Sequence, residues 1–388
     1  GICSCLSTCI TTYYDDLGRV SESVVVGDGK NISDLLSLQE YDEYGRKSRT
    51  WLPGVADSGN DGSFMDPVRL KQQSISDNND VEPYSYFTYD NSPLDSVVAL
   101  YGPGQDWHNK GKADRIIYST NKGSDPYRVI RFTYKSSDWN SGAYNVTNSG
   151  YYNEGMLDAS ESADEDGHKT YIFKNMFGEK ILVRHKVDDV YIDTYYIYDN
   201  MGNVLAILPP LAVDEISEEG ITLDCSLELG DYAYVYGYDY RGRLIMSKMP
   251  GAGENHYWYD KSDNRILTED PNGNITFCIT DKLGRVCLRG TCTNRYSADQ
   301  YDNDALPVTK AERTDDASEF MGYKVTGIKL TNPRITNVYY YDDYSYLKEY
   351  PKNLSSCFQS SNNVPVTKNM LTGSVTALLK DTVDHSYI

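Results

Sequence analysis

Apolar and polar positions alternate along the stretch from Tyr232 to Gly290. Tyrosines stand at every second position from 232 to 240, which places their rings on one face of a β-strand. Tyrosine also favours strands, because its flat ring packs well on a pleated, half-buried surface. Similar short runs follow, separated by turn residues, and predict a meander of antiparallel hairpins. These further strands are Leu244–Lys248, His256–Tyr259, Ile266–Glu269, Ile275–Thr280 and Val286–Leu288.

The rest of the chain shows the same pattern less regularly. Proline after Asp66 predicts a helix start, a second short helix is expected over Ala212–Glu219, and a helical turn near Ala317–Gly322. Residues 56–80 read as a surface excursion, residues 102–111 as a loop, and residues 206–230 and 293–335 as insertions. The strands predicted here are Ser21–Val26, Tyr84–Tyr89, Ser96–Tyr101, Arg115–Ser119, Tyr127–Tyr134, Leu157–Ser162, Lys169–Lys174, Lys180–Lys186, Val190–Tyr198, a hairpin over Ile335–Tyr350 and a closing strand over Met370–Leu379.

A short motif recurs at the ends of the aromatic strands: Tyr-Asp, two residues, Gly, and usually Arg or Asn. We expect Asp to accept hydrogen bonds from turn amides and Gly to take a positive φ. The Tyr ring should cover the neighbouring strand, with its hydroxyl reaching a partner. A period of roughly two dozen residues suits one hairpin per repeat. The motif residues are Tyr14, Asp15, Gly18, Arg19; Tyr41, Asp42, Gly45, Arg46; Tyr198, Asp199, Gly202; Tyr238, Asp239, Gly242, Arg243; Tyr259, Asp260, with Asn264 taken as the glycine replacement; and Asp281, Gly284, Arg285. Decayed copies are expected at Asn175–Gly178 and at Tyr341-Asp342.

This pattern resembles the YD repeat of bacterial RHS-repeat proteins. The stretches Tyr101–Trp107 and Leu208–Leu211 are also similar to the N-terminal region of a subgroup of large RHS-repeat proteins. The resemblance implies a long β-sheet that spirals into a hollow shell, which encloses or presents a C-terminal, toxin-like domain. It further implies a secreted or cell-surface protein of a bacterium, whose partner is the remainder of its own polypeptide.

The predicted fold is therefore all-β, with stacked antiparallel hairpins in a curved or spiralling sheet and a few short helices in the insertions. We divide the chain into an N-terminal RHS-associated region over 1–165 and a YD-repeat meander over 166–388, with one continuous β architecture as the alternative. The sequence starts at Gly1 and stops abruptly at Ile388, and we expect the natural polypeptide to continue.

Composition narrows the choice of partners. The net charge of −20 opposes binding to nucleic acid and to anionic membranes. No apolar run is long enough to predict a membrane span. The ratio of 36 Tyr to 8 Phe indicates aromatic residues with a buried ring and a solvated hydroxyl. The 8 cysteines lack zinc-ligand spacing, and mostly free thiols are expected.

The sequence offers no catalytic constellation. Its five histidines are scattered, and Gly104–Lys112 has the wrong spacing for a phosphate-binding loop. The run Asp164–Gly167 could ligate calcium, but a plain acidic turn is favoured. Asp270–Gly273 resembles only superficially the self-cleavage motif of RHS proteins and predicts a turn. The expectation is a protein that is not an enzyme, with no catalytic, cofactor or metal site.

Four tryptophans are the candidates for ligand contact: Trp51, Trp107, Trp139 and Trp258. Packing between hairpins is the favoured interpretation of these residues. The functional hypothesis is a non-catalytic scaffold segment of a large secreted or surface protein. The alternative is a module that binds a carbohydrate or a surface protein through its Tyr and Trp faces.

Overall fold

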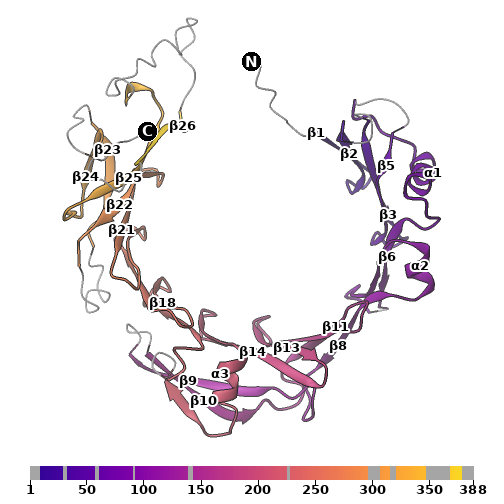
Figure 1. Cartoon of the computed structure of the whole chain (residues 1–388), viewed down its shortest axis with the longest axis horizontal. Helices are drawn as coiled ribbons and strands as arrows, with labels where there is room; N and C mark the ends of the chain where they lie inside the picture. Colours follow the sequence, from indigo (N-terminus) through magenta and orange to yellow (C-terminus); the bar gives the residue numbers. More distant parts are fainter. Residues whose placement is uncertain are drawn as a thin grey trace, which may run out of the picture. The chain divides into compact units, whose positions relative to one another are not determined.

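The computed structural model shows an all-β protein built from antiparallel hairpins, with three short helices in the part of the chain that it describes (Figure 1). This confirms the predicted fold class. The strands form where buried and exposed positions alternate, and many of them end at turns that contain a residue with positive φ. The described residues are 9–28, 33–56, 61–90, 92–138, 143–224, 228–295, 306–314, 320–346 and 368–377.

The chain divides into two compact units, and unit 1 comprises residues 1–129 and 152–193. Its strands pair antiparallel in the order β1, β2, β3, β4, β6, β7, β8, β11, β12, β13, and β5 pairs with β3. The elements are β1 (Cys9–Tyr14), β2 (Val20–Val26), β3 (Leu35–Tyr41), β4 (Lys47–Trp51), β5 (Gly54–Val55), α1 (Pro67–Asn78), β6 (Tyr84–Tyr89), β7 (Val97–Tyr101), α2 (Gln105–Asn109), β8 (Ala113–Thr120), β11 (Asp158–Ala163), β12 (Lys169–Lys174) and β13 (Lys180–Val187).

Unit 2 comprises residues 130–151 and 194–388, and the division falls inside β14. Its main sheet runs β14, β15, β17, β18, β19, β20, β21, β22, β25, β26, all antiparallel. Smaller sheets join β9 with β10 and β16, and β23 with β24. The elements are β9 (Ile130–Asp138), β10 (Ala143–Tyr151), β14 (Val190–Tyr198), β15 (Val204–Leu208), α3 (Pro210–Glu215), β16 (Thr222–Asp224), β17 (Tyr234–Tyr238), β18 (Leu244–Lys248), β19 (Glu254–Tyr259), β20 (Arg265–Glu269), β21 (Ile275–Thr280), β22 (Val286–Cys292), β23 (Lys310–Arg313), β24 (Tyr323–Thr326), β25 (Arg334–Tyr341) and β26 (Leu371–Thr376). The domain division predicted at 165/166 lies in the β11–β12 turn and stays a prediction.

The tyrosine-rich strand has two different faces. Tyr234, Tyr236 and Tyr238 are half-buried on one side of β17, while Val235 and Gly237 are buried on the other. The outer members of the run, at positions 232 and 240, were expected on the same strand but lie in the flanking turns. The strand is shorter than predicted because β15 pairs with it only from position 234.

The insertions cover an apolar face of the sheet, because an amphipathic sheet must bury that face against another element. The excursion over 56–80 contains α1, which contacts β3 and β5 and buries Leu70 in a core with Val24 and Leu36. The insertion over 293–335 was expected to be irregular, but it contains the β23–β24 hairpin. That hairpin buries Ala311 and Tyr323 in the core of unit 2.

Several predicted boundaries shift. The loop over 102–111 contains α2, whose first amide, at Gln105, donates to Asp80 at 3.0 Å. That contact comes from distant sequence, so local composition gave no sign of it. The helix expected over Ala212–Glu219 is α3, which ends at Glu215. The strand expected from Tyr127 is β9, which begins at Ile130. Residues 317–319 of the expected helical turn lie outside the described residues.

Candidate functional site

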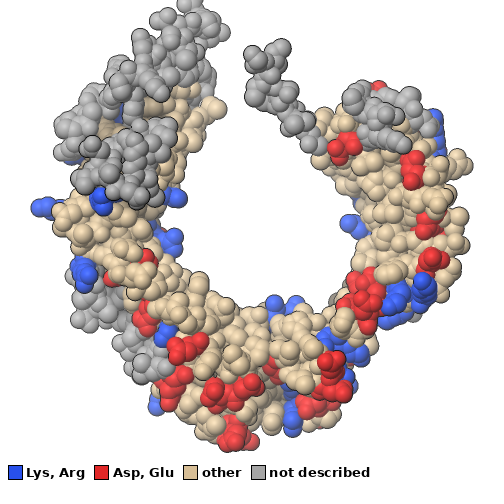
Figure 2. Space-filling view, viewed as in Figure 1, with Lys and Arg blue, Asp and Glu red and all other residues tan. Residues whose placement is uncertain are grey.

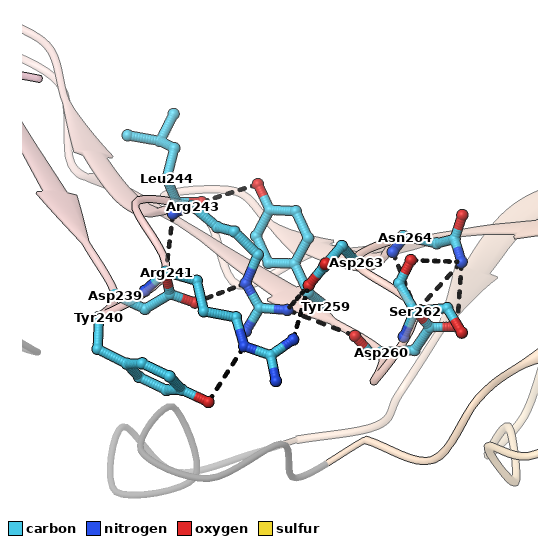
Figure 3. A network of polar contacts seen from close by, with 10 residues as sticks. All are labelled: Asp239, Tyr240, Arg241, Arg243, Leu244, Tyr259, Asp260, Ser262, Asp263 and Asn264. Atoms are coloured by element: carbon cyan, nitrogen blue, oxygen red, sulfur yellow. Dashed lines mark hydrogen bonds and ion pairs between the residues drawn. The ribbon is translucent and has the colours of Figure 1, made fainter.

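The recurring turn is built on one aspartate side chain, as Asp239 shows (Figure 3). Its Oδ1 accepts the backbone N–H groups of Arg241 and Arg243, each at 2.9 Å. Its own backbone N–H donates to the Arg243 carbonyl at 3.0 Å, and Gly242 N–H donates back to the Asp239 carbonyl at 2.9 Å. Gly242 has a φ of 77°, a conformation that glycine adopts without a steric cost. The Asp239 carboxylate therefore holds the turn together through its hydrogen bonds to the turn amides.

The arginine of the motif joins this turn to the next hairpin. Arg243 Nε donates to Asp239 Oδ2 at 2.6 Å, and its Nη1 donates to Asp263 Oδ1 at 2.7 Å (Figure 3). The guanidinium lies 5.0 Å from the ring centroid of Tyr259. The Tyr259 hydroxyl donates to the Leu244 carbonyl at 3.0 Å. The tyrosine of one hairpin thus packs under the arginine of the preceding hairpin and donates a hydrogen bond to that hairpin's backbone.

The same three-part contact recurs along the chain. In each case an arginine stacks on the tyrosine of the following hairpin, and that tyrosine donates to the carbonyl directly after the arginine. We call this contact the Arg–Tyr clasp. Its members are Arg19 with Tyr41 and Val20, Arg46 with Tyr89 and Lys47, Arg243 with Tyr259 and Leu244, and Arg285 with Tyr341 and Val286.

Three of the four clasps contain a further ion pair. Arg46, Arg243 and Arg285 bind the carboxylates of Asp95, Asp263 and Asp342, respectively. All three aspartates have positive φ values, of 49°, 62° and 71°. Aspartate tolerates this conformation better than most residues. In the first clasp the corresponding residue is Gly45, where an added Cβ would lie 2.9 Å from Arg19 Nη1.

The weaker copies of the motif keep the turn and change its side chains. In the turns that start at Asp199, Asp260 and Asp270, an asparagine side chain donates to the aspartate in place of arginine. His168 plays that part for Asp164, so the acidic run at 164–167 forms the same turn. At Asn175 the polarity reverses, because its amide donates to the Glu179 carboxylate at 2.6 Å.

Two motif assignments need correction, and one copy was missed. Asn264 is not the glycine replacement: Asp263 has the positive φ, and Asn264 stands where arginine does elsewhere. Tyr341 completes a clasp, but Asp342 takes the positive-φ position instead of starting a turn. The missed copy starts at Asp90, whose Oδ1 accepts the Ser96 amide at 3.0 Å. Its Tyr-Asp pair is visible in the sequence, but its longer turn breaks the motif's spacing.

The hydrogen bonds also fix the charge of these groups. The backbone N–H and the side chain of Arg19 lower the pKa of Asp15, and the Arg285 side chain lowers the pKa of Asp342. Hydrogen bonds to Asp342, and then to Asp281, raise the pKa of Arg285. Ionised carboxylates locked in ion pairs suit structural roles. An acid–base catalyst needs a pKa near the working pH.

The tryptophans do not form an exposed pair among the described residues. Trp51 is 7% exposed and donates its indole N–H to Glu40 at 2.8 Å. Trp258 is 5% exposed, and Trp107 is 38% exposed beside Gly102. Trp139 lies outside the described residues. Flat, accessible rings are what stacking on a sugar requires, and Trp51 and Trp258 do not offer them.

An open hollow of about 610 Å³ in unit 1 contains titratable side chains, among them Glu82 and His108. Both ring nitrogens of His108 are engaged: Nδ1 lies 2.7 Å from the Glu82 carboxylate, and Nε2 lies 2.7 Å from the Gly102 carbonyl. This histidine holds α2 against β6. Within the described residues, no group of three His, Cys, Asp or Glu side chains is placed to hold a metal ion.

Three further features concern the surface charge, the cysteines and the helices of the described residues. Figure 2 shows acidic side chains gathered around α3, where Asp214, Glu215, Glu218 and Glu219 are exposed. Cys9, Cys278, Cys287 and Cys292 are free thiols, and burial raises the pKa of Cys287 to about 11. No helix in the described part of the chain is long and apolar enough to cross a bilayer.

Hairpins joined by repeated clasps define a protein of the all-β repeat class. A family model described as "Domain of unknown function (DUF6443)" matches residues 5–120, a range that includes β1 to β8. Comparison with curated proteins gives no match. Among solved structures, the chain is similar to the TcdB2-TccC3-TEV crystal structure, with 12% identity, a TM-score of 0.47, and coverage of 96% of this chain and 17% of that chain.

It is also similar to the Tc holotoxin pore of Photorhabdus luminescens, with 12% identity and a TM-score of 0.47. That match covers 97% of this chain and 17% of the other. The chain therefore spans about one sixth of the length of the solved chains it matches.

Proposed function

We propose that this chain is a non-catalytic scaffold segment of a large RHS/YD-repeat protein, secreted or displayed on the surface of a bacterium. It forms part of a β-shell wall that encloses or presents a C-terminal domain. Its partner is the remainder of its own polypeptide. The observation that carries this proposal is the Arg–Tyr clasp, which joins consecutive hairpins at four places in the part of the chain that the structure describes.

The clasp supports a scaffold because it uses the charged and aromatic side chains that a functional site would need. Asp239 accepts turn amides, Arg243 bridges two turns, and Tyr259 binds a backbone carbonyl. One repeat position therefore has one role in successive hairpins. A catalytic centre is a single constellation, which does not recur at a hairpin period. The resemblance of the motif to the YD repeat adds the shell and the C-terminal domain to the proposal.

Removal of one whole repeat tests this role. Deletion of residues 239–259 joins Tyr238 to Asp260, restores a Tyr-Asp turn, and removes Arg243 and Tyr259 together. Nearest-neighbour stacking predicts that the shortened chain still unfolds cooperatively, at a lower Tm. The control deletes residues 239–258, so its deletion is one residue shorter and its chain one residue longer. A one-residue slip turns every side chain of a strand to the opposite face, and cooperative unfolding should be lost.

If the two deletion variants unfold in the same way in calorimetry, the stacked scaffold is contradicted.

A glycan array tests the alternative, in which the chain binds a carbohydrate. Reproducible binding that Trp107→Ala abolishes would replace the scaffold with a recognition module. Trp107 is the appropriate probe because it is the most exposed of the described tryptophans.

A further inference from the structure

The hairpin turns of unit 1 expose a large apolar side chain at one fixed position. Leu17, Tyr44, Leu94 and Phe177 each directly precede a residue with positive φ, and each is between 72% and 84% exposed. Their turns join β1 to β2, β3 to β4, β6 to β7 and β12 to β13. Connections alternate between the two ends of antiparallel strands, so these four turns lie along the same side of the sheet. We call these four residues the unit 1 rim.

Unit 2 repeats this feature in two turns and varies it in a third. Met201 and Leu283 directly precede a positive-φ glycine and are 76% and 68% exposed, in the β14–β15 and β21–β22 turns. In the β17–β18 turn Arg241 holds that position, and the exposed apolar side chain is Tyr240, one residue earlier and 64% exposed. By the same alternation these turns share one side of the unit 2 sheet. We call the three residues the unit 2 rim. Repeated exposure of large apolar side chains on one side of a sheet marks a contact surface.

The turn itself does not require these side chains. The β11–β12 turn of unit 1 and the β20–β21 turn of unit 2 lie at the opposite ends of the strands, and there the residue before the positive-φ glycine is Asp166 and Asn272, respectively. Both turns keep the same backbone and aspartate hydrogen bonds. Ser262 holds the position in the β19–β20 turn. Polar residues therefore fit the geometry, and the apolar rims need another explanation.

Spacing and charge indicate what would cover the rims. Consecutive hairpins lie about 10 Å apart, at two strand spacings, so a matching partner needs the same repeat. Exposed Asp16 and Glu43 adjoin Leu17 and Tyr44 on the unit 1 rim. Arg241 and Lys282 adjoin Tyr240 and Leu283 on the unit 2 rim. These two cations form surface ion pairs with Asp263 and Glu312, which cost little to exchange.

We propose that the unit 1 rim of one copy of this chain binds the unit 2 rim of a second copy. Both surfaces repeat at the hairpin period, and their flanking charges are opposite. Contact between two unit 1 rims would instead place Asp16 and Glu43 against the acidic residues of the other copy, where like charges repel. The proposal goes beyond the scaffold role and does not depend on it.

Sedimentation velocity on the whole chain over a concentration series tests this association. The buffer contains about 0.15 M salt, where screening limits the repulsion between two acidic chains. We expect reversible self-association. The triple variant Leu17→Ser, Tyr44→Ser, Leu94→Ser should raise the dissociation constant at least about tenfold, because the lost contacts are apolar. Serine is compatible with the turn, as Ser262 shows. Asn272→Ser, on the opposite side, should leave association unchanged.

A charge exchange identifies which rims meet. Glu43→Lys and Lys282→Glu should each weaken self-association, and a mixture of the two variants should contain a heterodimer between the unit 1 rim of the Lys282→Glu chain and the unit 2 rim of the Glu43→Lys chain. The double variant in one chain should recover association, because the exchanged charges are again opposite. A chain that stays monomeric up to roughly 100 μM would overturn the proposal. So would association that the triple serine variant does not weaken.

Discussion

At the scale of single residues, the tyrosines of the motif use both parts of their side chain. The ring of Tyr259 lies under Arg243, and its hydroxyl donates to a backbone carbonyl of the preceding hairpin. Phenylalanine could supply the ring but not the hydrogen bond. The excess of tyrosine over phenylalanine, 36 to 8, agrees with this double use.

Tyr259→Phe isolates the hydroxyl. The ring still packs on Arg243, while the Leu244 carbonyl loses a donor. We expect the free energy of unfolding to fall by about 1 kcal/mol, measured by urea denaturation. Tyr232→Phe is the matched control, because Tyr232 lies in a turn and is 39% exposed. An equal loss in both variants would show that the hydroxyl bond does not stabilise the chain.

At the scale of the element, the arginine of one turn forms an ion pair with the next turn only where that turn has a carboxylate at its positive-φ position. Gly45→Asp should create in the first clasp the ion pair that Asp95, Asp263 and Asp342 make in the others. Gly18→Asp is the control, since Gly18 has a similar φ of 75° and an added Cβ there meets nothing within 4 Å. Both variants carry the cost of a positive φ, and in Gly45→Asp the flexible end of Arg19, 2.9 Å from the added Cβ, must also move aside.

We expect Gly45→Asp to be more stable than Gly18→Asp by about 0.5 kcal/mol, a typical contribution of a surface ion pair. Thermal unfolding at low and high salt checks this. The difference should shrink at high salt, because screening weakens exposed pairs. A difference that is absent at low salt would contradict the assignment.

The elements also show how far sequence reasoning reaches. The bounds of β6, β12, β14, β18 and β21 were predicted to the residue, because turn residues mark both ends of each run. Local pattern failed where distant residues decide. Asp80 accepts the first amide of α2, which has no capping side chain of its own. In the Asp260 turn the residue that replaces glycine is Asp263, which binds Arg243, and not Asn264. Of the clasp, the sequence predicts a tyrosine ring that covers the neighbouring strand and a hydroxyl that reaches a partner. It does not identify the arginine and the carbonyl as the partners, because they lie in a separate hairpin.

At the scale of the whole molecule, the repeated aspartates make stability depend on pH. Hydrogen bonds from His168, Asn274 and Arg285 lower the pKa values of Asp164, Asp270 and Asp342. The folded chain therefore binds fewer protons than the unfolded chain just below the ordinary aspartate pKa of about 3.9. Stability is fully present above that value and falls as the pH decreases through the lowered values. Buried Glu22, whose pKa is raised by desolvation, contributes in the opposite direction.

We expect Tm to fall when the pH is lowered from about 5 to about 3. Asp270→Asn should reduce this fall, because asparagine does not titrate and can still accept turn amides, as Asn175 does. Calorimetry of both proteins across this range measures the effect. An identical pH dependence in the variant would mean that the Asp270 turn contributes nothing to it.

The clasp has a direction. Arginine always comes from the earlier hairpin and tyrosine from the later one, while Tyr14, in the first described hairpin, is 62% exposed. A hairpin that carries the clasp arginine thus leaves the ribosome with a finished acceptor for the hairpin that follows. The sheet can grow by addition at one end during synthesis, in the order of translation. Gene duplication can lengthen it by whole repeats, provided that each copy brings its tyrosine first and its arginine last.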